Sequence, residues 1–318
     1  MRNANPQTVK AVPKTDPADP PEAPGAEGKH DPAGPDEPPQ VGTASEGCGP
    51  EATAAARAPC CMDREPVICI ESLAVRYGQA EALRNVTMPI YRGCITAIVG
   101  PSGCGKSTFL NCLNRMTDMI EGCQVTGRIR IDDAQIIGRR IDLLALRRRV
   151  GMIFQKPNPF PLSIRSNLTF PLKEHGVRGR RRREARAHHA LEQVGLWKEV
   201  RDRLDEPALA LSGGQQQRLC LARALVLEPR ILLLDEPCSA LDPMASAVVE
   251  DLIGSLRGRY TVVIVTHNLA QARRVADDLA VFWKVNGAGT IIERGPASRV
   301  FASPKHELAA AYVSGRRG

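Results

Sequence analysis

The sequence lacks the long apolar run that a membrane-spanning helix needs. No stretch of about 18 consecutive apolar residues occurs in it. The first 30 residues contain no apolar core of the kind found in secretory signals. The ten cysteines form no C-x-x-C pair and no Cys/His cluster with zinc-ligand spacing, and no internal repeat is found. We therefore expect neither a membrane-spanning nor a secreted protein, nor a zinc module.

Residues 1–62 contain almost no large apolar side chains. They hold twelve of the 25 prolines, with five Lys or Arg and nine Asp or Glu, for a net charge of −4. Such a segment cannot bury enough surface to offset chain entropy, so we expect a disordered, acidic, proline-rich arm. The remaining residues carry a net charge of +12, which suits nucleic acid, a nucleotide or an anionic membrane surface, and equally a solvated basic surface.

Strand and helix patterns alternate from about residue 67 onward. Strands are expected at 67–78, 94–99, 149–154, 230–236 and 260–267, and helices at 106–116, 180–195, 215–227 and 243–257. The last two strands are nearly unbroken apolar runs, which is typical of strands buried on both faces of a parallel sheet. Residues 157–212 have little strand character and are expected to be mostly helical. The alternation predicts an α/β core.

The stretch "GPSGCGKST", residues 100–108, follows the apolar strand "CITAIV" and matches the spacing G-x-x-x-x-G-K-[ST]. Backbone N–H groups of such a loop, together with the N-terminus of the helix that follows, can surround a phosphate. Lys106 can reach the β- and γ-phosphates of a nucleotide, and Ser107 can bind Mg²⁺. A glycine-rich turn without a ligand is the alternative, but the flanking strand and helix favour a nucleotide site.

A pair of carboxylates ends another buried strand. In "ILLLDE", Asp235 could orient Mg²⁺ through water, and Glu236 could polarise the water that attacks the γ-phosphate. Two acids at a strand end are common in α/β proteins, so this pair alone does not decide the function.

Between these two motifs lies "LSGGQQQRLCLARAL", residues 211–225, and here the sequence resembles the ATP-binding cassette family, whose signature is LSGGQ. Ser212, Gly213 and Gly214 would begin a helix and so provide a second anion-binding terminus. The resemblance covers about residues 67–318. It implies a P-loop NTPase core with a mixed or parallel sheet, an antiparallel β subdomain and a helical signature subdomain at about 157–212, within one domain at 63–318.

The family pattern also assigns roles to single residues. Tyr77 in "VRYG" matches the aromatic residue that stacks on adenine, although it could simply pack in the core. Gln155 in "FQKPNPFP" matches a glutamine that contacts Mg²⁺ and the attacking water. Asp242 in "SALD" matches a loop that links two active sites, and His267 in "VTHN" matches a histidine that contacts the γ-phosphate.

These assignments give three sets of candidate residues. The catalytic set is Glu236, His267 and Gln155, and the metal set is Ser107, Gln155 and Asp235. The nucleotide-binding set comprises Tyr77, Gly100, Pro101, Ser102, Gly103, Cys104, Gly105, Lys106, Ser107, Thr108, Ser212, Gly213, Gly214, Gln215 and Asp242. In the family, two subunits sandwich two ATP molecules head to tail, so the resemblance implies a homodimer in which each signature closes over the partner's ATP.

Within the family, the sequence is most similar to phosphate-importer ATPases. The stretches that carry this likeness include "RRVGMIFQKPNPFPLSIRSNL", "DEPCSALDP" and the ending "YVSGRRG", where an aromatic residue is more usual before the last glycine. The resemblance implies ATP and Mg²⁺ as cofactors and ATP hydrolysis coupled to the movement of inorganic phosphate inward. It further implies two integral membrane permease subunits, an extracytoplasmic phosphate-binding protein as an indirect partner, and a peripheral location on the cytoplasmic face of the inner membrane.

Some features stay open at this level. No residue here selects phosphate physically, so an importer of another solute remains an alternative, as does a soluble cassette ATPase acting on nucleic acid or ribosomes, although no nucleic acid is expected. The arginine cluster formed by Arg178 and 180–183 could face anionic lipid or form a solvated helix face. The prolines after Gln155 are expected to keep roughly residues 156–170 extended, where the chain would meet its membrane partners.

Overall fold

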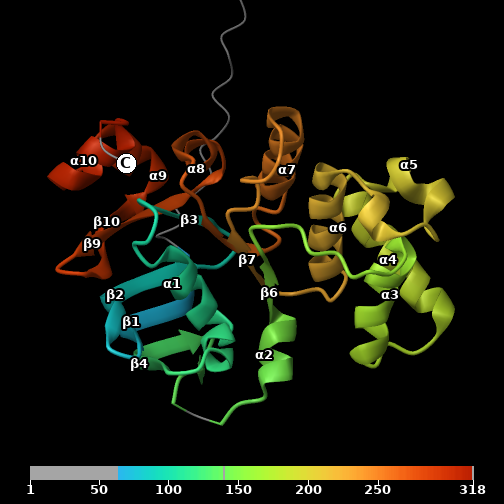
Figure 1. Cartoon of the computed structure of the whole chain (residues 1–318), viewed down its shortest axis with the longest axis horizontal. Helices are drawn as coiled ribbons and strands as arrows, with labels where there is room; N and C mark the ends of the chain where they lie inside the picture. The colour runs from blue at the N-terminus through green and yellow to red at the C-terminus, as the bar shows by residue number, and fades with distance from the viewer. Residues whose placement is uncertain (1–63, 139, 317–318) are drawn as a thin grey trace, which may run out of the picture. The chain divides into compact units, whose positions relative to one another are not determined.

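The computed structural model describes residues 64–138 and 140–316, so the expectation of a disordered arm at 1–62 lies outside the described residues. The described strands form one ten-stranded sheet with the order β5-β4-β1-β2-β10-β9-β3-β8-β7-β6 (Figure 1). The strands are β1 (Pro66–Tyr77), β2 (Ala80–Tyr91), β3 (Ile95–Val99), β4 (Cys123–Ile131), β5 (Ala134–Gln135), β6 (Val150–Ile153), β7 (Ile231–Asp235), β8 (Thr261–Val265), β9 (Asp278–Val285) and β10 (Ala288–Pro296).

Helices follow most of these strands. They are α1 (Lys106–Leu113), α2 (Leu143–Arg149), α3 (Ile164–Glu174), α4 (Arg180–Gln193), α5 (Trp197–Val200), α6 (Gly213–Leu225), α7 (Pro243–Ser255), α8 (Leu269–Val275), α9 (Ala297–Ala302) and α10 (Glu307–Val313), with short 3₁₀ turns at Met116–Met119, Arg201–Arg203 and Ala208–Ala210. None of the helices in the described ranges has both the length and the apolar character needed to cross a membrane.

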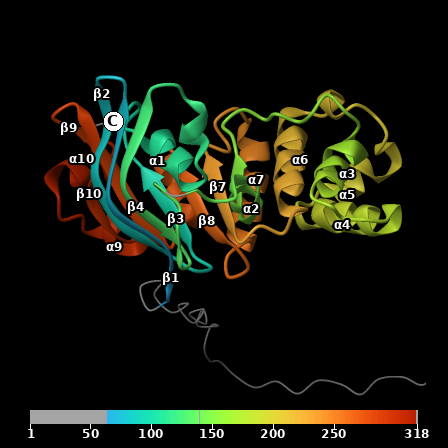
Figure 2. The same cartoon turned by 90° about the horizontal axis from the view of Figure 1, so that it is seen from below.

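The sheet has a parallel part and an antiparallel part. Strands β3, β6, β7 and β8 run parallel to one another, and β9 pairs in parallel with β3. Strands β1, β2, β4 and β5 pair antiparallel and join the rest through a single parallel pair between Gly289 and Leu83. Figure 2 shows this antiparallel part at one end of the sheet and helices α3–α6 beyond the other end. The predicted α/β core with its antiparallel addition is therefore confirmed.

Both faces of the parallel strands are buried, as the unbroken apolar runs indicate. Along β3, Ile95, Ala97 and Val99 face the apolar cluster that contains residues of α6, α7 and α8. Ile98 faces the opposite cluster, which holds Phe109 and Leu110 of α1. This alternation follows from the two-residue period of a strand. It fixes the carboxyl end of β3 between two packed layers, where the glycine-rich loop begins.

The region between β6 and β7 is built of helices, but its first part differs from the sequence expectation. Helix α3 begins at Ile164, because the hydroxyl of Ser163 accepts a hydrogen bond from the backbone N–H of Ser166 at 3.1 Å and caps the helix. Residues 156–163 are not helical, but the expectation of an extended chain is wrong for 164–170. An N-cap serine outweighs the three upstream prolines here.

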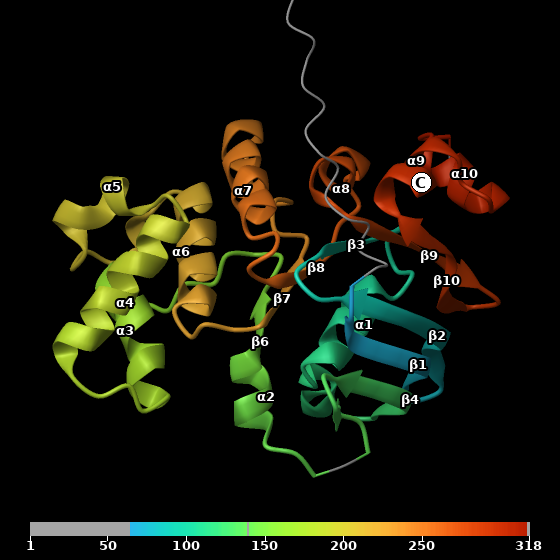
Figure 3. The same ribbon diagram turned by 180° about the vertical axis from the view of Figure 1, so that it is seen from behind.

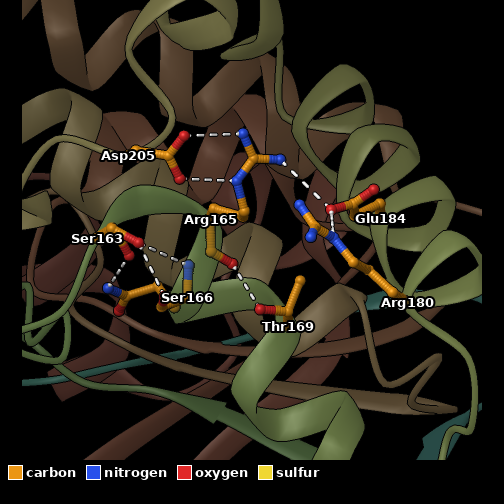
Figure 4. A network of polar contacts seen from close by, with 8 residues as sticks. Ser163, Arg165, Ser166, Thr169, Arg180, Glu184 and Asp205 are labelled. Atoms are coloured by element: carbon orange, nitrogen blue, oxygen red, sulfur yellow. Dashed lines mark hydrogen bonds and ion pairs between the residues drawn. The ribbon is translucent and has the colours of Figure 1, made fainter. Parts of the chain in front are cut away.

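Arg165 ties the helices of this region together (Figure 4). Its guanidinium donates to both carboxylate oxygens of Asp205, at 2.8 and 3.1 Å, and lies 3.8 Å from Glu184 of α4. Glu184 in turn accepts from Arg180 at 2.8 Å. Within the arginine cluster, Arg183 donates to the carbonyl of Val177, while the remaining arginines, Arg178, Arg180, Arg181 and Arg182, are exposed.

Candidate nucleotide site

The loop at 100–105 leaves the carboxyl end of β3 and leads into α1. Gly100 has φ +150°, and a Cβ atom there would lie 2.2 Å from the carbonyl oxygen of Phe282 in β9. Gly105 has φ +91°, and a Cβ atom there would lie 2.5 Å from the side chain of Leu83 in β2. Both positions therefore need glycine, since any side chain would collide with the neighbouring strands. The loop is pressed against the antiparallel part of the sheet.

Lys106 is the first residue of α1 and is only 6% exposed. Its ammonium donates hydrogen bonds to the carbonyl oxygens of Gly100 and Pro101, both at 2.8 Å. A buried cation is costly unless it is paired or hydrogen-bonded. The loop's own carbonyls hold this positive charge at the helix N-terminus, where an anionic ligand gains from the charge and from the helix dipole.

Two of the three residues expected to bind the metal, Ser107 and Asp235, lie together. Ser107 donates its hydroxyl hydrogen to a carboxylate oxygen of Asp235, 3.0 Å away, although 128 residues separate them. Burial raises the pKa of Asp235, and the hydrogen bond from Ser107 opposes that shift. A hydroxyl and a carboxylate fit Mg²⁺, which prefers oxygen ligands and commonly takes few protein groups besides phosphates and water. No cluster of three or more His, Cys, Asp or Glu suited to a metal occurs among the described residues.

Glu236 contacts the other two catalytic candidates. Its carboxylate lies 2.9 Å from Nδ1 of His267 and accepts from the side-chain amide of Gln155 at 3.2 Å. The three residues follow β7, β8 and β6, and the carboxyl ends of parallel strands meet at one edge of a sheet. Glu236 also has φ +45°, an uncommon value for a residue with a side chain. Such strained residues occur preferentially at functional sites.

These residues surround a cavity of about 920 Å³. Among the predicted residues, it is lined by Gly100, Pro101, Ser102, Gly103, Gly105, Lys106, Ser107, Thr108, Gln155, Glu236 and His267. Cys104 belongs to the loop, but its side chain is 1% exposed and packs in the apolar cluster around α1. The loop, one wall of carboxylate, histidine and glutamine, and the buried lysine thus form a single anion-binding space.

Sequence reasoning missed six residues that line the same cavity. They are Ala80, Glu81, Ala82, Lys284, Gly287 and Tyr312. The Asn286–Gly287 pair between two apolar strands is a hairpin signal that could have placed Gly287 on a turn and Lys284 in the strand before it. Nothing local points Ala80–Ala82 or Tyr312 toward the loop, because tertiary packing brings them there.

Tyr77 does not line this cavity. It is half-buried, its ring packs against the apolar cluster around α1, and its hydroxyl donates to the hydroxyl of Thr108 at 3.4 Å. Burial raises the pKa of the Tyr77 phenol. The residue therefore lies beside the loop, and its role in stacking on a base stays a prediction.

The signature residues lie apart from the cavity. Ser212 caps α6: its hydroxyl accepts from the backbone N–H of Gln215 at 3.4 Å, and the Gln215 side chain accepts from the Ser212 N–H at 3.0 Å. Asp242 caps α7 by accepting from the N–H of Ala245 at 2.9 Å. Ser212, Gly213 and Asp242 are exposed, and neither they nor Gly214 and Gln215 line the space around Lys106.

Comparison with known proteins agrees with this geometry. The family model described as ABC transporter matches residues 83–239. A phosphate import ATP-binding protein, PstB 1, of Nitrosococcus oceani is 60% identical over 82% of this chain and 94% of its own length. One of the same name from Vibrio parahaemolyticus is 49% identical over 80% and 93%. The chain belongs to the ABC transporter family.

A solved structure extends the likeness to the fold. CbiO1 from Clostridium perfringens, described as part of an ABC transporter complex, is 28% identical with a TM-score of 0.65, over 80% of this chain and 96% of its own. As an ABC ATPase the chain binds ATP. Within this ABC fold, Gln155, Glu236, His267 and all of the predicted loop residues 100–108 except Cys104 line one space, and the signature forms a second, separate group.

Proposed function

We propose that the chain is the ATP-hydrolysing subunit of a membrane importer for inorganic phosphate. The observation that carries this proposal is the 60% identity, over nearly the full length of the relative, to a protein named for phosphate import and ATP binding. The site provides what ATP hydrolysis requires: a phosphate-binding loop, a carboxylate beside the phosphate position and a histidine next to that carboxylate. An importer of another solute would use the same site.

The residues divide the chemistry among them. The loop N–H groups and Lys106 bind the β- and γ-phosphates, and Glu236 orients and polarises the attacking water. His267, 2.9 Å from Glu236, contacts the γ-phosphate, and Gln155, which donates to the same carboxylate oxygen at 3.2 Å, contacts the attacking water. Ser107 and Asp235 would hold Mg²⁺, whose positive charge neutralises charge that develops on the phosphate oxygens when it is bound. Catalysis rests on positioning and charge, without a covalent intermediate.

The exposed signature supports a homodimer. A second copy, placed head to tail, would bring the partner's signature helix over the γ-phosphate bound at Lys106, so each ATP is held by both subunits. This places the exposed Ser212 and Asp242 at the seam. ATP binding would close the dimer, and hydrolysis would reopen it.

The chain after Gln155 suits contact with membrane subunits. Phe160, Leu162 and Phe170 are 36–45% exposed, and the rings of Phe160 and Phe170 stack edge to face at 5.9 Å. Exposed apolar side chains that gather in this way mark contact surfaces. The partners we propose are two integral permease subunits, with a phosphate-binding protein on the outer side and the ATPase on the cytoplasmic face.

The test is reconstitution. The chain is purified with its co-purifying membrane subunits, placed in vesicles, and assayed for ATP hydrolysis with phosphate or with sulfate as the solute. We expect stimulation by phosphate alone. Stimulation by a different solute would keep the ATPase and reject phosphate as cargo, and absence of ATP hydrolysis under all conditions would reject the proposed function.

A further inference from the structure

An arginine of α6, the helix that begins at the signature, contacts the chain that follows Gln155. Arg223 lies near the C-terminal end of α6. Its Nη2 atom donates a hydrogen bond to the side-chain oxygen of Asn158 at 2.9 Å, and its Cζ atom lies 4.2 Å from the centre of the Phe160 ring. Figure 3 shows α6 between β6 and helices α3 and α4, and the chain that leaves β6 passes across it. The contact with Asn158 therefore joins two segments that lie 65 residues apart in sequence.

The span from Gln155 to Asn158 is short, and its two ends are anchored on different parts of the protein. At one end, the side-chain amide of Gln155 donates to the carboxylate of Glu236 at 3.2 Å. At the other end, Asn158 accepts from Arg223. A span of three residues reaches about 10 Å at most, and Pro157 fixes one of its backbone dihedral angles. A displacement of α6 is therefore passed on to Gln155, because the span has little slack to absorb it.

The same segment is also held against α3. The buried side chain of Asn167 accepts a hydrogen bond from the N–H of Phe160 at 2.8 Å and donates one to its carbonyl oxygen at 3.1 Å. The Phe160 ring in turn packs edge to face on Phe170. Residues 158–160 are thus fixed on α3 by Asn167 and on α6 by Arg223. The segment and the two helices form one connected unit.

Arg223 is a costly residue in the place that it occupies. Burial lowers the pKa of its guanidinium, and no carboxylate among the described residues forms an ion pair with it. Its Nη1 atom is buried and has no hydrogen-bond partner within the described ranges. A buried cation without a counter-ion is destabilising, and a long apolar side chain would pack over Phe160 without that cost. Packing alone therefore does not account for an arginine here, whereas a directed hydrogen bond to Asn158 does.

We propose that Arg223 is a positioning residue that ties the signature helix to Gln155 through Asn158, so that the placement of the signature and of Gln155 are linked. This inference rests on the proposed function, because that function assigns Gln155 to the attacking water. The competing explanation is that Arg223 only fills space between α6 and Phe160. The two explanations differ in whether the hydrogen bond to Asn158 affects turnover, since the stem of the side chain alone provides the packing.

The experiment removes the guanidinium and keeps a long side chain. Arg223→Met and Asn158→Ala are made separately and together. The control is Arg186→Met, since Arg186 lies in α4, is also partly buried, and pairs with Glu228 at 3.0 Å. For each full-length chain, the dissociation constant for ATP is measured by calorimetry with Mg²⁺ present, and the unfolding midpoint by thermal melting. The kcat and KM for ATP are measured in the complex with the membrane subunits.

For Arg223→Met we expect kcat to fall about three- to tenfold, the effect of one lost hydrogen bond on the placement of Gln155. The dissociation constant and the KM for ATP should stay within about twofold of wild type, because neither Arg223 nor Asn158 lines the ATP cavity. The unfolding midpoint should not fall, since a buried cation is removed.

The other variants test whether the effect passes through Asn158. Asn158→Ala should lower kcat to a similar extent as Arg223→Met. The double variant should be no slower than the slower single variant, because both substitutions break the same link. Arg186→Met should hydrolyse ATP like wild type.

Two results would overturn the inference. One is a kcat of Arg223→Met equal to that of wild type or of Arg186→Met; with a lowered unfolding midpoint, this result would show that Arg223 acts by packing alone. The other is a double variant whose loss of kcat equals the product of the two single losses, since the two side chains would then act independently. If the wild-type complex itself does not hydrolyse ATP, the proposed function fails instead, so the two failures are distinguishable.

Discussion

In the described part of the chain, the two helix N-termini proposed to meet a phosphate are built differently. At α1, the loop, Lys106 and the wall formed by Glu236 and His267 enclose a cavity, and the lysine is 6% exposed. At α6, Ser212 and Gly213 stand exposed, and the helix is capped by its own Ser212 and Gln215. The site at α1 is therefore enclosed by residues on several sides but is not covered. The end of α6 is exposed and has no residues around it that enclose a ligand.

In the proposed dimer, these two regions are complementary halves of one ATP site. A cap made of local side chains keeps the N-terminus of α6 formed without a ligand. This helix end can therefore stay exposed to solvent. The buried lysine of α1 needs the loop carbonyls to hold it in place. In that dimer, a subunit alone would bind ATP on the first half, and the second half would gain a ligand when another copy provides one. Two substitutions, one in each half, test this comparison most strongly.

Glu236→Gln should have the largest effect. Removing the carboxylate charge leaves the loop and Lys106 intact, so ATP binding should persist while ATP hydrolysis falls by at least about 100-fold. The measurements are the steady-state rate of phosphate release and the dissociation constant for ATP. Glu228→Gln is the control, because Glu228 is exposed and lines no part of the ATP cavity. An equal loss of binding and hydrolysis would count against Glu236 as the residue that acts on water.

Ser212→Arg should block hydrolysis by a different route. A large cation at the end of α6 prevents the signature from closing over a partner's nucleotide, while ATP binding to single subunits should match wild type. The sharper measurement mixes this variant with Glu236→Gln. Half of the composite sites in a mixed dimer then combine an intact loop and Glu236 with an intact signature, so hydrolysis should reappear above the level of either variant alone.

No recovery on mixing would argue that the two halves do not meet across a dimer. Full hydrolysis by Ser212→Arg alone would reject the shared site outright. The control is Ser255→Arg, which lies at the end of α7 and away from both halves.

The first half could be predicted from sequence because its chemistry is local. The loop residues occupy nine consecutive positions, and Asp235, Glu236 and His267 lie at or just after the ends of apolar strands whose parallel pairing brings them to one edge. The positions of the other residues around the site depend on packing between segments that are distant in sequence. Nothing in "YVSGRRG" shows that Tyr312 lines the cavity with Gly100, and nothing near Tyr77 shows that its hydroxyl meets Thr108.

The strand predictions show the same limit. Strands β3, β6, β7 and β8 were predictable because burial on both faces leaves unbroken apolar runs. Strands β2, β4 and β10 carry mixed patterns, since one face or one end of each is exposed, and no long apolar run distinguishes them from loops. Strand β9 does contain a buried apolar run, at residues 279–282, which the strand predictions missed. The onset of α3 was misplaced because one serine cap decided it.

Two arginine–carboxylate networks, one around Glu293 and one around Asp205, have similar ion pairs but differ in how deeply the carboxylate is buried. Glu293, in β10, has a side chain only 4% exposed and accepts hydrogen bonds from Arg299 and from two backbone N–H groups. Glu293→Gln should lower the free energy of unfolding at pH 7 by about 1–3 kcal/mol, since a buried charged acceptor is lost. Thermal or urea unfolding of wild type and of Glu293→Gln measures this loss of stability.

The pH dependence of that loss has a defined sign. Burial alone would raise the pKa of Glu293, but the hydrogen bonds from His306, Lys305 and Arg299 lower it below its ordinary value of 4.5. A lowered native pKa stabilises the fold above the unfolded-state pKa, and this stabilisation is lost as the pH falls through the native pKa. The difference in the free energy of unfolding between wild type and Glu293→Gln should thus be greatest above about pH 5 and shrink below it. A difference that grows on acidification would contradict the assignment.

Asp205 in the helical region should show the smallest effect. Its carboxylate accepts two hydrogen bonds from Arg165, as Glu293 accepts from Arg299, but its side chain is 79% exposed (Figure 4). Water and salt screen such a pair, and holding two long side chains together costs entropy. Asp205→Asn should leave the unfolding midpoint unchanged within error at 0.15 M salt, and ATP hydrolysis should match wild type. A loss as large as that of Glu293→Gln would show that burial does not govern the difference between the two networks, and would point to Arg165 as a structural support of the signature region.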